Sequence, residues 1–225
     1  MIATTAKSAM RLALPAAAAL ALLLGACTSF KSNLQVPQAW ALRYAPMAPE
    51  VAAAGATPRA VPPAGAAAGS AGAAGAQLPA LQVLRPLAAP GLDDDHITLL
   101  RDGQKLDFYA GARWAAPLPE VIEQVAIEAL RARGGYRAVL GEGAAFASEQ
   151  SLQLEIVRCS AVYAGSGAPE VQVKLVASFG RRDDRRLLAT QVLEAKVQAT
   201  DNRLGAVAAA YERAVNSALA QLTPP

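Results

Sequence analysis

Two segments of the chain carry apolar residues at helical spacing. The first predicted helix starts after Pro117 and covers about 118–133, where apolar side chains recur every three or four positions. The second covers about 203–222, and Asp201 or Asn202 before it offers an N-cap side chain. Each helix therefore has one apolar face that must be buried against another element.

Alternation of apolar and polar residues predicts strands elsewhere in the chain. Short strands are expected at 81–87, 97–101 and 105–109, with a hairpin turn at Asp102-Gly103. Three longer strands are expected at 151–163, 171–177 and 186–199. Together these elements predict an α+β fold: a two-layer domain with a mostly antiparallel sheet and two long helices packed on one face.

The N-terminus has the pattern of a secretory signal peptide. Residues 1–11 carry Lys7 and Arg11 without an acid, an apolar run fills 12–24, and small residues precede Cys27. The apolar run is shorter than the ~20 residues that a transmembrane helix needs. The sequence therefore predicts a signal peptide at 1–26.

The end of this segment, Leu24-Gly25-Ala26-Cys27, resembles the lipobox of bacterial lipoproteins. In that motif the cysteine thiol, which is a strong nucleophile as thiolate, receives a diacylglyceryl group, and the new amine is acylated with a chain such as palmitate. The alternative is an ordinary signal peptide with a cysteine near its cut site. Thr28 follows where an aspartate would favour retention in the inner membrane, so we expect an anchor in the outer membrane, facing the periplasm.

Composition divides the rest of the chain. Residues 27–47 form the lipidated N-terminus, in which 39–45 is a candidate first strand. The stretch 48–80 is nearly all Ala, Gly and Pro, with few side chains to bury, and predicts a flexible linker or a disordered insertion. The ordered domain is expected at 81–222, long enough for one core.

Charge and motif content argue against several function classes. Without Lys7 and Arg11 the chain has 19 basic and 18 acidic side chains, so its net charge is +1, and no basic cluster indicates nucleic-acid binding. His96 after three aspartates lacks the ligand set of a metal site. No nucleophile elbow or phosphate-binding loop is present, so we expect neither an enzyme nor a cofactor. Cys159 is expected to be buried, the alternative being a disulfide between chains.

The run Tyr109-Ala110-Gly111-Ala112-Arg113-Trp114 has two readings. As a structural element, Tyr109 ends a strand, Gly111 permits a turn and Trp114 covers the core. As a functional element, Tyr109, Arg113 and Trp114 are candidate partner-binding residues, because these types are enriched at interface hot spots. Residue type alone favours the structural reading.

Several short motifs resemble those of the ABC-type transport auxiliary lipoprotein family, and the run from Tyr109 to Trp114 is the most specific. The resemblance covers about 81–222 and the lipobox. The Ala/Gly/Pro-rich stretch has no counterpart, and Cys159 stands where a larger apolar residue is expected. The matching residues are Pro90-Gly91-Leu92-Asp93, Ile97, Arg101, Leu106, Tyr109 to Trp114, Pro117-Leu118-Pro119, Arg185-Arg186-Leu187-Leu188-Ala189, Ala209, Tyr211 and Ala214.

The resemblance implies a non-enzymatic part of an envelope transport machine. Members of the family accompany systems with a mammalian-cell-entry (MCE) domain protein, an inner-membrane permease and a cytoplasmic ATPase, whose cargo is lipid, in particular phospholipid. The lipoprotein would dock the far end of the MCE assembly at the outer membrane, and a ring-shaped homo-oligomer suits such a collar. The runner-up is a structural or regulatory lipoprotein that binds an envelope enzyme or a secretion channel. Lipid carriage in the chain's own pocket would need a cavity.

Overall fold

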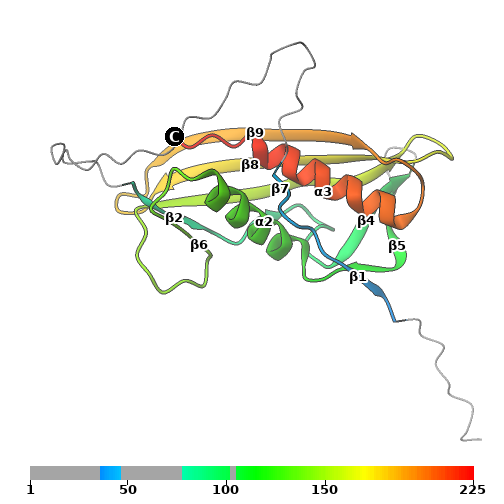
Figure 1. Ribbon diagram of the computed structural model, residues 1–225, viewed down its shortest axis with the longest axis horizontal. Coiled ribbons are helices and arrows are strands. Elements are labelled where there is room, and N and C mark those ends of the chain that lie inside the picture. Colours follow the sequence, from blue (N-terminus) through cyan, green and yellow to red (C-terminus); the bar gives the residue numbers. More distant parts are fainter. Residues whose placement is uncertain (1–35, 47–77, 102–104) are drawn as a thin grey trace, which may run out of the picture. The chain divides into compact units, whose positions relative to one another are not determined.

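The computed structural model describes residues 36–46, 78–101 and 105–225, and Figure 1 shows how their elements are arranged. Cys27, the predicted signal peptide, most of the Ala/Gly/Pro-rich stretch and the predicted Asp102-Gly103 turn lie outside these residues. The helices are α2 (Leu118–Arg133) and α3 (Leu204–Ala220). The strands, joined in one nine-stranded sheet, are β1 (Gln38–Trp40), β2 (Ala80–Val83), β3 (Leu87–Ala88), β4 (His96–Arg101), β5 (Lys105–Trp114), β6 (Ala138–Leu140), β7 (Gln150–Tyr163), β8 (Glu170–Arg181) and β9 (Leu187–Gln198).

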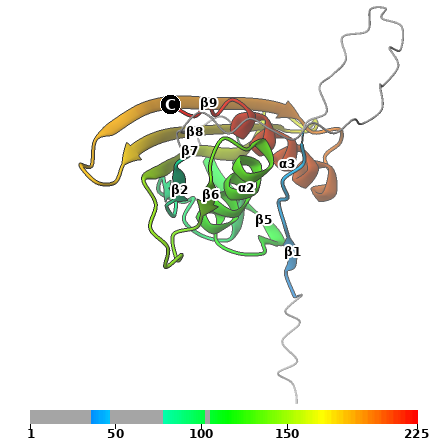
Figure 2. The same cartoon turned by 60° about the vertical axis from the view of Figure 1, so that its left-hand side comes forward.

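Strand β7 is central to the sheet because it is long enough to pair with three short strands in succession. β2 pairs with its beginning, β3 with its middle and β4 with its end, each in parallel. β7 also pairs antiparallel with β8, which pairs antiparallel with β9. A strand of 14 residues spans about 45 Å, and β7, β8 and β9 run together along the molecule in Figures 1 and 2.

The antiparallel pairing predicted for the three long strands is confirmed, as is that of β4 with β5. The prediction of a mostly antiparallel sheet is wrong, because the sheet is mixed. The parallel pairs are β1–β5, β2–β6, β2–β7, β3–β7 and β4–β7. The alternation of apolar and polar residues shows which side chains share a face of a strand. It does not show whether a partner strand far away in the sequence runs parallel or antiparallel.

Both helices form where the apolar spacing predicts them. α3 contacts β8 and β9, and α2 contacts β2, β6 and α3. The Arg133 guanidinium donates to the carbonyls of Leu219, at 3.0 Å, and Leu222, so it links the C-terminal ends of the two helices. The narrower expectation that both helices pack on a single face of the sheet stays a prediction.

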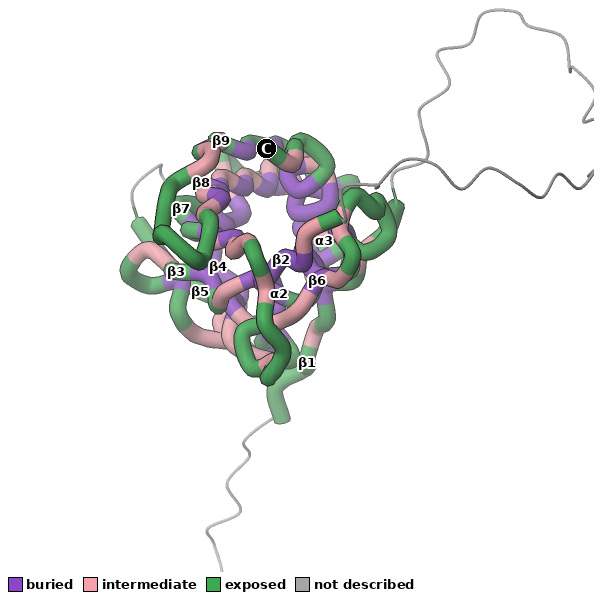
Figure 3. Tube along the Cα trace, turned by 90° about the vertical axis from the view of Figure 1, so that its left-hand side faces the viewer, coloured by how far each residue is buried: buried purple, intermediate pink, exposed green. Residues whose placement is uncertain are grey.

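The core lies between the helices and the long strands. Buried residues line the interior of the backbone trace in Figure 3, and their side chains fill the space that the trace encloses. The largest fully buried side chains include Tyr211 and Phe179, together with leucines and isoleucines of α2, β2, β4, β7, β8 and β9. Cys159 is among the buried residues, as expected, and desolvation raises the pKa of its thiol to about 12. Among the described residues, no helix has the length and apolar character to cross a membrane.

Candidate functional site

The motif from Tyr109 to Trp114 forms the second half of β5 and contains a bulge. His96 pairs with Arg113, and Thr98 pairs with Phe108. The step from one pair to the other is two residues along β4 but five residues along β5. Gly111 lies in this bulge with a φ of 69°, a conformation that residues with a Cβ rarely adopt. Beyond the bulge, Ala112 and Trp114 are buried and Arg113 is exposed. The glycine therefore sets which side chains of the motif face the core.

Trp114 is a core residue at 3% exposure. Its ring packs edge-to-face on Tyr211 of α3, with 5.2 Å between ring centroids. Tyr211 is fully buried and its hydroxyl donates to the carbonyl of Thr98, while desolvation raises its pKa well above the usual value. The pair joins β4, β5 and α3. A partner-binding role for Trp114 stays a prediction. Trp114 is buried, whereas its neighbour Arg113 is exposed.

Arg113 is held in a defined position at the surface. Its Nη1 donates to both carboxylate oxygens of Asp95, at 2.9 and 3.2 Å, and about 44% of its side chain is exposed. The backbone N–H of Trp114 donates to the Asp95 carbonyl at 2.7 Å. One residue, Asp95, therefore fixes both the side chain of Arg113 and the backbone after it.

The neighbouring Asp94 and His96 complete the turn that starts β4. The Asp94 carboxylate accepts from the His96 backbone N–H at 2.9 Å and lies 2.8 Å from its Nδ1. Burial raises the pKa of Asp94, but these bonds and the charges of His96 and Arg113 outweigh it, so the pKa is lowered. Ligand atoms of Asp94, Asp95 and His96 lie within 4.8 Å of one another, yet each carboxylate already binds a protein donor. We therefore assign this group to the turn.

Tyr109 starts a polar chain that crosses the same end of the sheet. Its hydroxyl lies 2.9 Å from that of Tyr163, which donates to Asn202 Oδ1 at 2.7 Å, and the Arg101 guanidinium lies over the Tyr163 ring at 5.5 Å. Desolvation and the bond with Tyr163 raise the pKa of Tyr109. Sequence reasoning missed Arg101 and Tyr163 as its neighbours. The cap expected from Asp201 or Asn202 is not formed, because Arg203 occupies the N-cap position. The parallel pairing of β4 with β7 places Arg101 opposite Tyr163.

The N-terminal segment is docked beside this motif. β1 pairs in parallel with residues 112–114 of β5. It overlaps the candidate first strand, expected at 39–45, only at Ala39 and Trp40. Asn216 of α3, 5% exposed, then holds the following residues: its Nδ2 donates to the Arg43 carbonyl at 2.9 Å, and its Oδ1 accepts from the Ala45 N–H at 3.1 Å. The route from Cys27 into the domain therefore passes the Tyr109–Trp114 motif.

Asn216→Ala is expected to release this segment. The change removes both bonds, and each such bond contributes about 0.5–1.5 kcal/mol to stability. Hydrogen exchange of residues 38–46 should accelerate while exchange in β7 and β8 stays slow. Glu212→Ala, which removes a single exposed bond to the Arg43 N–H, is the matched control and should have little effect. Unchanged exchange of 38–46 in Asn216→Ala would show that Asn216 does not hold the segment.

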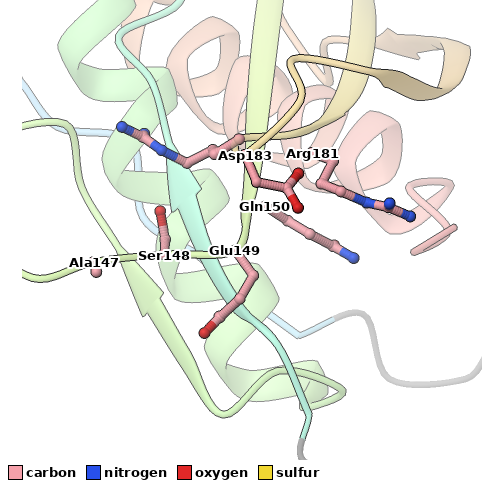
Figure 4. A pocket seen from close by; sticks show the side chains of 7 residues that line it. Ala147, Ser148, Glu149, Gln150, Arg181 and Asp183 are labelled. Atoms are coloured by element: carbon pink, nitrogen blue, oxygen red, sulfur yellow. The ribbon is translucent and has the colours of Figure 1, made fainter.

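A surface pocket of about 590 Å³ lies where β7 begins and β8 ends, and Figure 4 shows it from close by. Its lining comes from the segment that leads into β7 and from the turn between β8 and β9: Ala147, Ser148, Glu149, Gln150, Arg181, Arg182 and Asp183. Sequence reasoning missed the pocket, because its two halves are far apart in the chain. The charged residues of that turn were the only signal.

The comparison with known protein families supports the family resemblance that the Tyr109–Trp114 motif suggests. The family model described as "ABC-type transport auxiliary lipoprotein component" matches residues 61–223. The chain belongs to this family. No curated protein sequence matches the chain.

Two solved structures with TM-scores above 0.5 share the fold. A Xanthomonas campestris protein of the DUF330 family is 27% identical, with a TM-score of 0.57, over 63% of this chain and 79% of that one. An uncharacterized protein is 12% identical, with a TM-score of 0.53, over 64% of this chain and 92% of that one. PelC from Paraburkholderia phytofirmans, a dodecamer, is 16% identical, with a TM-score of 0.40, over 67% of this chain and 95% of that one.

Proposed function

We propose that this chain is an outer-membrane-anchored periplasmic lipoprotein that docks an MCE-type lipid transport assembly at the membrane. The family match supports a role as an auxiliary transport component. The observation that carries the docking role is the pairing of β1 with residues 112–114 of β5. It joins the segment that leads from Cys27 to the most specific motif of the family.

Chain length limits the distance between the anchor and this motif. Val36, where the described residues begin, stands nine positions after Cys27. An extended chain covers at most about 3.6 Å per residue, so lipid on Cys27 keeps Val36 within about 32 Å of the anchored residue. β1, which begins at Gln38, is then within about 40 Å. The Tyr109–Trp114 end of the domain therefore works close to the membrane that holds the lipid.

The exposed residues at this end suit a protein partner. Arg113 is already oriented by Asp95, and Arg101 by the ring of Tyr163. An oriented arginine loses less side-chain freedom on binding than a free one, and arginine and tyrosine are enriched among residues that carry binding energy. We assign the contact with the MCE protein to the exposed Arg101 and Arg113 and to the half-buried Tyr109 between them and the core.

The proposed role needs no bond-making chemistry. The Cys159 thiol is buried with its pKa raised to about 12, so little thiolate forms near neutral pH. The Asp94–His96 group is bound to its own backbone and to Arg113. These residues shape the domain, and transport is left to the permease, the ATPase and the MCE protein.

Crosslinking followed by pull-down tests the partner. The tagged, lipid-anchored full-length protein is expected to recover an MCE-domain protein from cells that express both. Cys27→Ala, which lacks the anchor, should recover less. Recovery of a peptidoglycan synthase or a secretin in its place would contradict the proposal and favour a regulatory envelope lipoprotein, and repeated failure to recover the MCE protein would also contradict it.

A further inference from the structure

Strand β9 lies at an edge of the sheet, since β8 is its only partner strand among the described residues. It is 12 residues long, and an edge of that length offers a row of main-chain groups with which another strand can pair. In an antiparallel pair, alternate residues direct their N–H and C=O toward the partner. The Ala199 N–H, just after β9, donates to the Pro169 carbonyl on the β8 side. Odd-numbered residues of β9 therefore face β8, and even-numbered residues from Thr190 to Gln198 face outward.

The chain after α3 covers the middle of this outer edge. The Gln221 amide binds the main chain of Glu194 in both directions: its Oε1 accepts from the Glu194 N–H at 3.2 Å, and its Nε2 donates to the Glu194 carbonyl at 2.7 Å. The Gln191 amide does the same for Thr223, accepting from its N–H at 2.9 Å and donating to its carbonyl. Figures 1 and 2 show this end of the chain beside β9. We call residues 221–225 the C-terminal strap.

The strap imitates a neighbouring strand without being one. A glutamine side chain ends in an amide like that of the peptide bond, so Gln221 gives Glu194 the donor and acceptor that a paired strand would give. Pro224-Pro225 follow in the strap, and proline has no N–H with which to add to a ladder. Among the residues that the structure describes, no hydrogen bond from outside the sheet reaches the outward main chain of Val192 or Lys196. The strap is thus the local cover of this edge.

Without the strap, the edge of β9 would suit a second copy of itself. In an antiparallel pair of two β9 strands centred on Ala195, Glu194 of each copy stands opposite Lys196 of the other, and opposite charges in such positions stabilise the pair. Glu194 already binds Lys174 of β8 at 2.7 Å, whereas Lys196 has no ion pair with any residue that the structure describes. The same pairing would cover Val192, which is 55% exposed. Charge and apolar surface therefore both favour self-pairing of an open edge.

From these contacts we infer that the C-terminal strap is an autoinhibitory closure, which blocks β9 from pairing with β9 of a second copy. The strap binds at Glu194, in the middle of that pairing, so the strap and a second copy exclude each other. Proteins commonly cover long edge strands, because an open edge is a template for aggregation. The inference is independent of the proposed docking role, since neither β1 nor Arg113 contributes to it.

Hydrogen exchange of the double variant Gln191→Ala/Gln221→Ala, called the open-strap variant, tests the closure. Gln221 is exposed and Gln191 is half-buried, so the two changes leave the core intact. At low protein concentration, before copies associate, exchange of the Glu194 N–H should accelerate about tenfold or more, because its hydrogen bond to Gln221 is gone. Exchange of the Leu193 and Ala195 N–H groups, which face β8, should stay slow.

A second double variant provides the matched control for the lost amides. Gln153→Ala/Gln198→Ala also removes two glutamine side chains that bind main-chain carbonyls, one of them on β9 itself, but neither touches the strap. Exchange of the Glu194 N–H should be the same in this control as in the wild type. Unchanged exchange of Glu194 in the open-strap variant would show that the strap does not close the edge and would overturn the inference.

Analytical ultracentrifugation of the full chain with Cys27→Ala tests the self-pairing. With increasing concentration, the open-strap variant made in this chain should associate further than its parent, whereas the control double variant should behave like the parent. Adding Lys196→Glu to the open-strap variant should weaken the association about tenfold, because two like-charge pairs with Glu194 replace two opposite-charge pairs. Association of the open-strap variant equal to that of its parent, or association that Lys196→Glu leaves unchanged, would overturn the inference.

Discussion

Replacing Trp114 by alanine is expected to lower the free energy of unfolding by about 3–5 kcal/mol, the usual cost of removing a large aromatic side chain from a core. The indole is 3% exposed and packs on Tyr211, which itself is fully buried. Its loss opens a cavity at the junction of β4, β5 and α3. Urea denaturation followed by circular dichroism measures the change.

Arg113→Ala is the matched control one residue away. Its ion pair with Asp95 is exposed, and such pairs contribute about 0–1 kcal/mol, so the midpoint of unfolding should hardly move. The two variants separate the structural and functional readings of the motif. If Trp114→Ala unfolds at the same urea concentration as the wild type, Trp114 does not stabilise this part of the core.

Removing the thiol of Cys27 is expected to move the protein from the membrane to the soluble periplasmic fraction. Cys27→Ala leaves no atom to carry the diacylglyceryl group, and each buried CH₂ of the lost chains contributes about 0.8 kcal/mol to membrane binding. Fractionation of the envelope and immunoblotting measure the shift. Cys159→Ala is the control: that thiol is buried in the sheet, and its loss should leave the protein in the membrane fraction.

The anchoring role has a functional readout as well. If the family role holds, the soluble Cys27→Ala variant should fail to restore the envelope barrier in a strain without the wild-type protein. Full restoration by the soluble variant would show that the anchor is dispensable, and the tether between Cys27 and β1 would then need another explanation.

Local features of the fold were predictable because local rules govern them. Apolar spacing located α2 and α3 within about three residues, and alternation located β7, β8 and β9. The same logic does not identify Glu123 of α2 as an inward-facing residue, yet Glu123 is buried and its carboxylate accepts from the Glu142 N–H at 3.1 Å. A polar side chain can face inward when a distant loop supplies its donor, and a helical pattern does not show such a loop.

Features that depend on distant pairing were not predictable. The parallel pairs of β7 with β2, β3 and β4 join segments separated by helix α2 or long connections, and nothing in the alternation of either partner records them. β6, with three residues, is too short to produce a pattern. The pocket combines residues near 149 with residues near 182 and was missed for the same reason.

The Tyr109–Trp114 motif contains one feature that the sequence predicts and one that depends on distant pairing. Residue types alone nominated Tyr109, Arg113 and Trp114 without separating core from surface. The bulge at Gly111 makes that separation, since it turns Trp114 toward Tyr211 and leaves Arg113 with Asp95. The chain carries the glycine that permits the bulge, but the register against β4 that reveals it exists only in the folded sheet.

Site-specific photo-crosslinking in living cells tests the docking claim most directly. A photoreactive residue in place of Arg113 should form a covalent adduct with the MCE-domain protein, whereas one in place of Lys196, on strand β9, should not. Both positions are solvent-exposed, so the comparison separates a defined docking surface from general proximity. An adduct at Arg113 and none at Lys196 is the predicted result. Adducts with the MCE protein at Lys196 but not at Arg113 would contradict the account.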